Sequence, residues 1–262
     1  MKKLLLAAAV SVVLSSGAFA QTNAFDFAAN YGGGGEPGWT NGANAGFGFG
    51  AWTISSSGGT GGFAGNFIAN PGAAITNGGA EITGMSPESF GLYANPAGSG
   101  AFVNASRTLN TALQVGDTFS FQWGINWDSG NGTSGNKGFN LFAGTNQVVN
   151  VNNGGNSDIQ FNTINTGFGF GTAAMNWSFT YSGATTLAVS ANDRDGVGIF
   201  STNITVGGGV DSFQLYAANM ASGDARNPYF NDLQVVPEPS TYALLALSAA
   251  GLGAHLIRRR RR

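Results

Sequence analysis

The sequence predicts an all-β fold: a single β-sandwich domain between an N-terminal signal peptide and a C-terminal membrane-spanning segment. Apolar and polar residues alternate with period two, most clearly over residues 118–127, and no window shows the apolar period of an amphipathic helix. Residues 21–236 contain 40 glycines and 27 asparagines, which favour turns over long helices. The long apolar stretches lie near the two ends of the chain.

Residues 1–20 have the three parts of a secretory signal peptide. Residues 1–3 carry the positive charge, residues 4–14 are apolar, and a small-x-small cleavage site ends in Ala18 and Ala20. We therefore expect cleavage after Ala20. The alternative is that this segment forms a first, buried helix.

Residues 21–236 form the predicted sandwich domain. Short alternating or apolar segments separated by Gly- and Asn-rich turns are typical of a sandwich or a barrel, and one apolar face on each strand suits two packed sheets. The expected strands cover residues 25–27, 52–54, 90–93, 102–109, 118–127, 139–143, 149–151, 159–164, 177–181, 187–191, 204–206, 210–217 and 230–235.

The C-terminal segment, residues 237–262, combines a proline motif, an apolar stretch and a cluster of arginines. Residues 242–257 would make a single transmembrane helix roughly 24 Å long, which is slightly short for a bilayer. Positive residues stay in the cytoplasm, so the domain is expected on the other side of the membrane. The membrane-orienting residues are Arg258, Arg259, Arg260, Arg261 and Arg262.

These three elements, in this order, resemble the PEP-CTERM sorting signal of Gram-negative bacteria. The resemblance implies an exported precursor anchored in the inner membrane until an exosortase, a membrane-embedded cysteine protease or transpeptidase, acts near Pro237, Glu238 and Pro239. The protein would then be released or transferred to the cell surface. Both prolines fix φ, so the motif is presented extended, as proteases require. The alternative is an ordinary tail anchor with a proline hinge.

The domain itself is similar to exported Gly-rich jelly-roll domains that carry such a tail. The similarity rests on Gly-Phe-Gly-Ala-Trp, Phe-Gly-Leu-Tyr-Ala, Val-Gly-Asp-Thr-Phe-Ser-Phe and Tyr-Phe-Asn-Asp-Leu-Gln-Val, beginning at residues 48, 90, 115 and 229. It implies a jelly-roll-like sandwich, and such domains mostly lack an assigned activity. With the sorting tail, the leading hypothesis is a non-catalytic exported protein of the cell surface, extracellular matrix or biofilm. A carbohydrate-binding module for exopolysaccharide is the alternative, and a glycoside-active enzyme is a third hypothesis.

Charge and composition exclude several functions. Residues 21–236 hold four basic residues against twelve acidic ones, a formal charge of −8, so no nucleic-acid partner is expected. They contain no His or Cys, because His255 lies in the tail, which excludes His-dependent triads, zinc sites and thiolate chemistry. The glutamates Glu36, Glu81 and Glu88 form no paired-carboxylate motif. We expect no catalytic residue and no cofactor.

No metal site is expected either, although two loops offer oxygen ligands of the kind that Ca²⁺ prefers. Asp193 and Asp195 are the better candidates, and Asp128 is the weaker one. None belongs to a complete EF-hand loop, and Asp side chains in turns commonly bind their own backbone.

The aromatic residues divide into core and surface candidates. Trp123 and Trp127 share a strand face with two phenylalanines, so we expect them in the core. Trp39, Tyr93 and Tyr229 lie nearer turns and are the expected surface rings for a sugar platform. The sequence Gly-Phe-Gly-Phe-Gly occurs at residues 46–50 and 167–171; it lacks the spacing of a nucleotide loop and predicts two equivalent strands in one sheet.

Overall fold

The computed structural model describes residues 22–32, 38–72, 82–96, 99–125, 135–154, 158–169, 171–220 and 227–237. Several predicted features lie outside these ranges, so their structure is not described: the signal peptide, Glu36, Glu81, Trp127, Asp128, Glu238, Pro239, the span over 242–257 and the arginine cluster. Among the described residues, no helix has the length and apolar character needed to cross a membrane.

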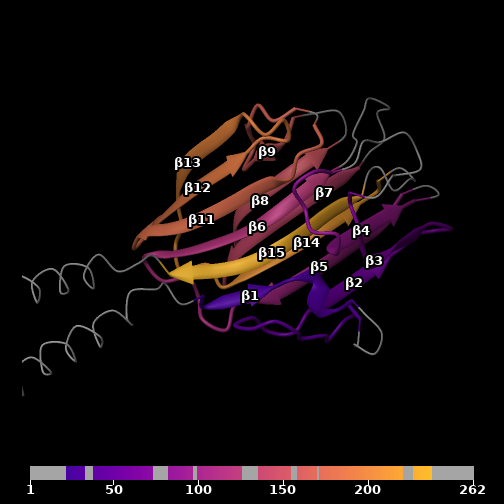
Figure 1. Cartoon of the computed structure of the whole chain (residues 1–262), viewed down its shortest axis with the longest axis horizontal. Coiled ribbons are helices and arrows are strands. Elements are labelled where there is room, and N and C mark those ends of the chain that lie inside the picture. Colours follow the sequence, from indigo (N-terminus) through magenta and orange to yellow (C-terminus); the bar gives the residue numbers. More distant parts are fainter. Residues whose placement is uncertain are drawn as a thin grey trace, which may run out of the picture.

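Strands dominate the described part of the chain, which forms two antiparallel sheets (Figure 1). The larger, eight-stranded sheet contains, in spatial order, β13 (Ile199–Thr205), β12 (Thr186–Asn192), β11 (Met175–Gly183), β6 (Asp117–Ile125), β15 (Pro228–Pro237), β4 (Ser89–Asn95) and β3 (Phe63–Ala69), with β1 (Ala24–Asp26) paired to β15. The seven-stranded sheet contains β10 (Ile164–Asn165), β9 (Gln160–Phe161), β8 (Asn146–Gly154), β7 (Asn136–Ala143), β14 (Ser212–Ala218), β5 (Phe102–Thr108) and β2 (Thr53–Ser57). One short 3-10 helix, η1 (Ala28–Asn30), follows β1.

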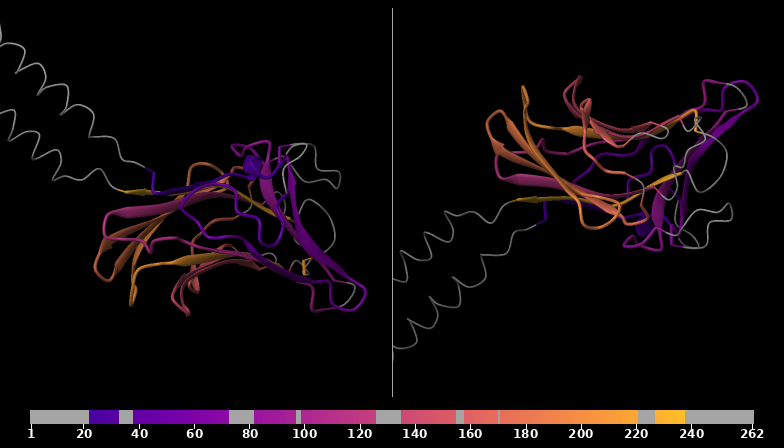
Figure 2. Two further views of the ribbon diagram at one scale, coloured as in Figure 1. Left: turned by 90° about the horizontal axis from the view of Figure 1, so that it is seen from below. Right: turned by 90° about the horizontal axis from the view of Figure 1, so that it is seen from above.

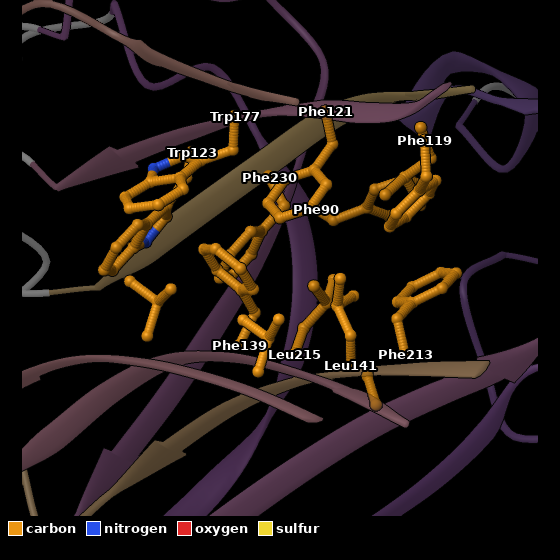
Figure 3. Close-up of a cluster of buried hydrophobic side chains, with 14 of the residues drawn as sticks. Phe90, Phe119, Phe121, Trp123, Phe139, Leu141, Trp177, Phe213, Leu215 and Phe230 are labelled. Atoms are coloured by element: carbon orange, nitrogen blue, oxygen red, sulfur yellow. The ribbon is translucent and has the colours of Figure 1, made fainter. Parts of the chain in front are cut away.

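The two sheets pack face to face, as the views in Figure 2 show. The alternation in the sequence explains this packing, because every second side chain of a strand points to the same face. In β6, Phe119, Phe121 and Trp123 are buried between the sheets. Figure 3 shows them facing Phe139 and Phe213 of the other sheet. The predicted two-sheet sandwich is therefore confirmed.

The last strand, β15, lies in the middle of the larger sheet. It pairs with β6 along one side, and with β4 and then β1 along the other. Phe230 lies before, and Leu233 within, an irregularity in its pairing with β6, and both are fully buried. The core is thus completed by residues immediately before the C-terminal segment.

One predicted strand was wrong, and one strand was missed. The segment 159–164 is two short strands, β9 and β10, because Asn162 (φ 43°) and Thr163 (φ 71°) make a tight turn between them. The strand β3 was not predicted. Its sequence, Phe-Ala-Gly-Asn-Phe-Ile-Ala, lacks clean alternation, and it is an edge strand with mostly half-buried side chains.

The two Gly-Phe-Gly-Phe-Gly segments are not equivalent strands of one sheet, contrary to the prediction. The first forms only isolated bridges, and the strand that follows it, β2, belongs to the seven-stranded sheet. The strand that follows the second segment, β11, belongs to the other sheet. Trp52 and Trp177, which follow the two segments, nevertheless both enter the core.

Candidate binding site beside the end of the last strand

The first and last described strands lie side by side at one end of the sandwich (Figure 1). Ala24 is paired with Val235, and the backbone N–H of Asn23 donates to the carbonyl of Val235 at 2.7 Å. On the other side of β15, Pro237 is paired with Asp117 at the start of β6. The first proline of the predicted sorting motif is therefore still part of the sheet.

A Gly-Phe strip, residues 46–50, runs along the free edge of β1. The backbone N–H of Phe25 donates to the carbonyl of Phe47 at 2.9 Å, and the N–H of Phe47 returns a bond of the same length. Gly48 has a φ of +78°, and a Cβ there would lie 2.3 Å from the carbonyl oxygen of Asn23. Glycine is required because the strip lies directly against the backbone of β1.

The strip buries one phenylalanine and exposes the other. Phe49 is 3% exposed and contacts Phe213 edge-on, with ring centroids 5.8 Å apart. Phe47, in contrast, is 55% exposed, with its ring centroid 6.1 Å from that of Phe25. The two rings are two positions apart, so a regular strand would place both on one face; Gly48 between them has a left-handed φ of +78°, which breaks this pattern and leaves Phe47 on the surface.

Arg107, from β5, binds the strip on its buried side. It forms a fully buried ion pair with Asp26 of β1. Its Nε donates to the carbonyl of Gly50 at 2.6 Å, and its Nη2 donates to Oδ1 of Asn44 at 2.5 Å. The guanidinium also lies 5.2 Å from the ring centroid of Phe49, within the range of a cation–π contact. One side chain therefore connects β1, β5 and the segment that leads into the strip.

A tyrosine hydroxyl completes the buried network. Tyr31 donates to Oδ2 of Asp26 at 2.8 Å and accepts from Nε1 of Trp52 at 3.0 Å. Burial raises the pKa of Asp26, while the Arg107 charge and hydrogen bonds from Asn30 and Tyr31 act in the opposite direction. Burial, and then the negative charge of Asp26, raise the pKa of Tyr31 well above its ordinary value. Tyr31 is therefore a neutral hydroxyl at physiological pH.

An open hollow of about 620 Å³ lies between the strip, the segment after β5 and the end of β15. Val235 and Asp117 line it on the β15 side. The rest of the wall is mixed. Exposed, uncharged polar side chains come from Asn23, Asn44, Asn110, Thr111 and Gln114, and glycines and apolar residues, including Phe47 and Leu109, supply the remainder. Among the described residues, no Lys or Arg lines it. The lining thus supplies amide and hydroxyl groups and one aromatic face, the means of non-covalent binding to a polar ligand.

The two aspartates considered for Ca²⁺ bind the backbone of their own turn. Oδ1 of Asp193 accepts the N–H of Arg194 at 2.6 Å, and Oδ1 of Asp195 accepts the N–H groups of Val197 and Gly198 at 2.8 and 3.0 Å. Burial raises the pKa of Asp193, whereas the two backbone N–H groups lower that of Asp195. Within the described ranges, no cluster of three or more His, Cys, Asp or Glu residues is placed to hold a metal ion.

The expected surface rings were wrongly chosen. Trp39 is 5% exposed and Tyr229 is 3% exposed, and Tyr93 is half-buried beside Phe67, with ring centroids 6.1 Å apart. The exposed ring at the hollow is Phe47, which sequence reasoning missed. Its signal was the glycine on each side, because a ring flanked by glycines is consistent with a segment pressed against another backbone.

The C-terminal segment matches a known family. Residues 235–262 match the PEP-CTERM protein-sorting motif, so the chain carries this motif, and its first residues are the last residues of β15. The motif implies that the protein is exported and sorted through processing by an exosortase. The comparison with curated proteins gave no match.

Solved structures share the sandwich only distantly. The globular domain of calreticulin from T. cruzi is 10% identical, with a TM-score of 0.42 over 80% of this chain and 95% of that one. A carbohydrate esterase from Shiga toxin-encoding bacteriophage phi24B is 11% identical, with a TM-score of 0.42 over 71% and 90%. A Stig cyclase from Fischerella sp. TAU is 12% identical, with a TM-score of 0.40 over 84% and 99%. All these TM-scores lie below 0.5, so the likenesses carry no functional argument.

Proposed function

We propose that this chain is a non-catalytic protein of the cell surface or extracellular matrix, processed by an exosortase from a precursor anchored in the inner membrane. The observation that carries the proposal is the PEP-CTERM match over residues 235–262. In the proposed precursor, residues 1–20 direct export, residues 242–257 span the membrane and the arginine cluster remains in the cytoplasm.

The end of β15 supports removal of the tail. β15 ends at Pro237, and its buried side chains, such as Leu233 and Val235, lie before the Pro-Glu-Pro residues 237–239. A cut on the C-terminal side of Pro237 therefore leaves every described strand intact. Between Pro237 and residue 242 the sequence provides four residues, so processing takes place close to both the folded domain and the membrane.

The non-catalytic role is supported by the residues available. Residues 21–236 contain neither His nor Cys. The hollow beside β15 is lined by amides, a hydroxyl, one aspartate and apolar groups, without a nucleophile–base pair. Binding, rather than bond cleavage, is the chemistry that this lining favours.

The test is to replace Pro237, Glu238 and Pro239 together by Ala in a host that contains an exosortase. We expect uncut precursor in the inner-membrane fraction, whereas the wild-type protein should lose the tail, as measured by intact mass. The matched control is Pro87→Ala with Glu88→Ala, because it removes another Pro-Glu pair, which is exposed in a loop of the domain.

Two outcomes would contradict the proposal. One is a mature wild-type protein that still carries Arg258 to Arg262, which would indicate an ordinary tail anchor. The other is loss of processing in the control as well, which would mean that a general folding defect, not the motif, controls the cut.

A further inference from the structure

We propose that the hollow beside β15 is a binding site for a neutral oligosaccharide, with one sugar ring stacked on Phe47. This inference goes beyond the proposed role as a sorted surface protein and assigns a ligand class to the folded domain. It rests on three properties of the hollow: a fixed exposed ring, a lining that includes amides and a hydroxyl, and a set of described lining residues without Lys or Arg.

The exposed ring is held in place before any ligand arrives. Phe47 exchanges two backbone hydrogen bonds of 2.9 Å with Phe25, and Gly48 packs directly on the backbone of β1. Arg107 fixes both ends of the segment, at Asn44 and Gly50. Since little backbone freedom is left to lose, ligand binding has a small entropic cost there.

The polar lining suits hydroxyl groups. Each sugar hydroxyl both donates and accepts a hydrogen bond, and an amide side chain offers both partners at once. Asn23, Asn44, Asn110 and Gln114 contribute four amides, and Thr111 adds a hydroxyl. Three of the amides already make one bond within the protein: those of Asn23 and Gln114 donate, and that of Asn44 accepts from Arg107. Their other groups are available to a ligand. Their exposure means that they remain hydrated without a ligand, so binding exchanges hydrogen bonds with water for hydrogen bonds with sugar.

Charge restricts the ligand to neutral sugars. No Lys or Arg of the described part of the chain lines the hollow, and the buried Arg107 is already paired with Asp26. Asp117 is the one charged residue among the described lining residues, and its charge is negative. Residues 21–236, with Asp117 included, carry a formal charge of −8. A polymer of uronate or sulfate groups would meet repulsion without any compensating cation.

The size of the hollow fits a short oligosaccharide. Its volume of about 620 Å³ lies within the range of roughly 300–1,000 Å³ that is typical of small-molecule sites. It is also open to one side, so a longer glycan chain can extend beyond it. A membrane surface is the competing occupant, because the hollow lies at the end of the domain from which residues 238–262 leave.

The test measures glycan binding by the full-length protein in a zwitterionic detergent without a sugar headgroup. Neutral gluco-, manno-, galacto- and xylo-oligosaccharides are compared with oligomers of uronic acid, first on an array and then by calorimetry. We expect binding to neutral oligosaccharides only. Phe47→Ala should weaken binding about tenfold or more, as expected when an aromatic stacking contact is lost. Phe47→Trp should retain it.

Phe63→Ala is the matched control. Phe63 is 73% exposed on the edge strand β3, outside the hollow, so its loss should leave affinity unchanged. Gln114→Ala should weaken binding less than Phe47→Ala, because it removes one hydrogen-bonding group. Equal melting temperatures of these variants would show that folding is not the cause.

Three results would overturn the proposal. The first is no binding to any neutral oligosaccharide, and the second is equal binding to uronate oligomers. The third is a loss of binding to phosphatidylcholine–phosphatidylethanolamine vesicles in Phe47→Ala without any loss of glycan binding, which would assign the ring to the membrane instead. None of these results depends on exosortase processing, so they leave the proposed function separately testable.

Discussion

Arg107 and Asp26, which are 81 positions apart in the sequence, form an ion pair whose two side chains are fully buried. The pair joins β5 of one sheet to β1 of the other, and the Gly-Phe strip lies against it. The position of the exposed Phe47 therefore depends on a contact deep inside the sandwich.

Breaking this pair should strongly destabilise the domain. Asp26→Ala leaves the Arg107 guanidinium buried without its carboxylate, and we expect a loss of about 3–5 kcal/mol in the free energy of unfolding. Denaturant titration of the processed protein measures it. Glu88→Ala, at an exposed carboxylate, should change the same quantity by less than about 0.5 kcal/mol. Equal effects of the two substitutions would mean that the pair does not hold the strip.

Gly48→Ala tests the close approach of the strip to β1. The new Cβ would lie 2.3 Å from a backbone oxygen at a φ of +78°, and we expect destabilisation of at least about 1–3 kcal/mol. The control is Gly144→Ala, which has a φ of +60° but no atom within 4 Å of the added Cβ. Both substitutions introduce dihedral strain, so the extra loss of unfolding free energy in Gly48→Ala measures the clash with β1. Equal losses in the two variants would contradict a requirement for close contact.

Trp123→Ala tests the core. Trp123 is fully buried and stacks on Phe230 with ring centroids 6.1 Å apart. Its loss should cost about 3–5 kcal/mol in the free energy of unfolding, measured by denaturant titration. Phe63→Ala, at a ring on the outside of β3, should cost less than about 0.5 kcal/mol, and a similar cost at both positions would contradict the burial of Trp123.

Removing the charge of Asp232 should increase the free energy of unfolding by an amount that depends on pH. Burial raises its pKa, so its contribution to stability is complete below the ordinary value of 3.8 and is lost as the pH rises through the folded-state pKa. Asp232→Asn should therefore stabilise the protein at pH 7 more than at pH 3. Asn also accepts the left-handed φ of 53° at this position. Denaturant titration at both pH values checks the difference.

Asp195 supplies a control, because its substitution should change the free energy of unfolding at pH 7 in the opposite direction. The N–H groups of Gly198 and Val197 lower its pKa, so its contribution is present above 3.8 and is lost as the pH falls through the folded-state pKa. Asp195→Asn should consequently destabilise at pH 7 and have little effect at pH 3. If both substitutions change stability in the same direction at pH 7, burial does not determine the behaviour of Asp232.

Calcium should have no specific effect on the melting temperature. The carboxylates of Asp193 and Asp195 already accept backbone N–H groups in their turn. We expect millimolar Ca²⁺ and Mg²⁺ to shift the melting temperature equally, since both only screen the net negative charge. A larger shift with Ca²⁺ that disappears in Asp193→Ala with Asp195→Ala would establish a site at this turn.

The sequence predicted the sheets better than it predicted the site, for a physical reason. The alternation over residues 118–127 is a local pattern that predicts which side chains face the core, and the burial pattern of β6 agrees with it. The ion pair of Arg107 and Asp26, in contrast, depends on how two sheets meet. The need for glycine at position 48 likewise depends on a backbone that is distant in the chain. Local patterns contain neither relationship, so they did not identify Phe47 as the exposed ring. The expected surface rings were instead Trp39, Tyr93 and Tyr229.

The pairing of β1 with β15 also determines how this domain can be combined with other chains. Its two ends meet at one point, where the N–H of Asn23 is 2.7 Å from the carbonyl oxygen of Val235. A domain with adjacent ends can be inserted into a loop of a host protein, or reopened elsewhere after its ends are joined, without stretching the fold. A circular permutant that joins residues 22 and 237 through a short Gly-Ser linker and opens at Gly208, where an added Cβ would meet nothing within 4 Å, should keep both sheets.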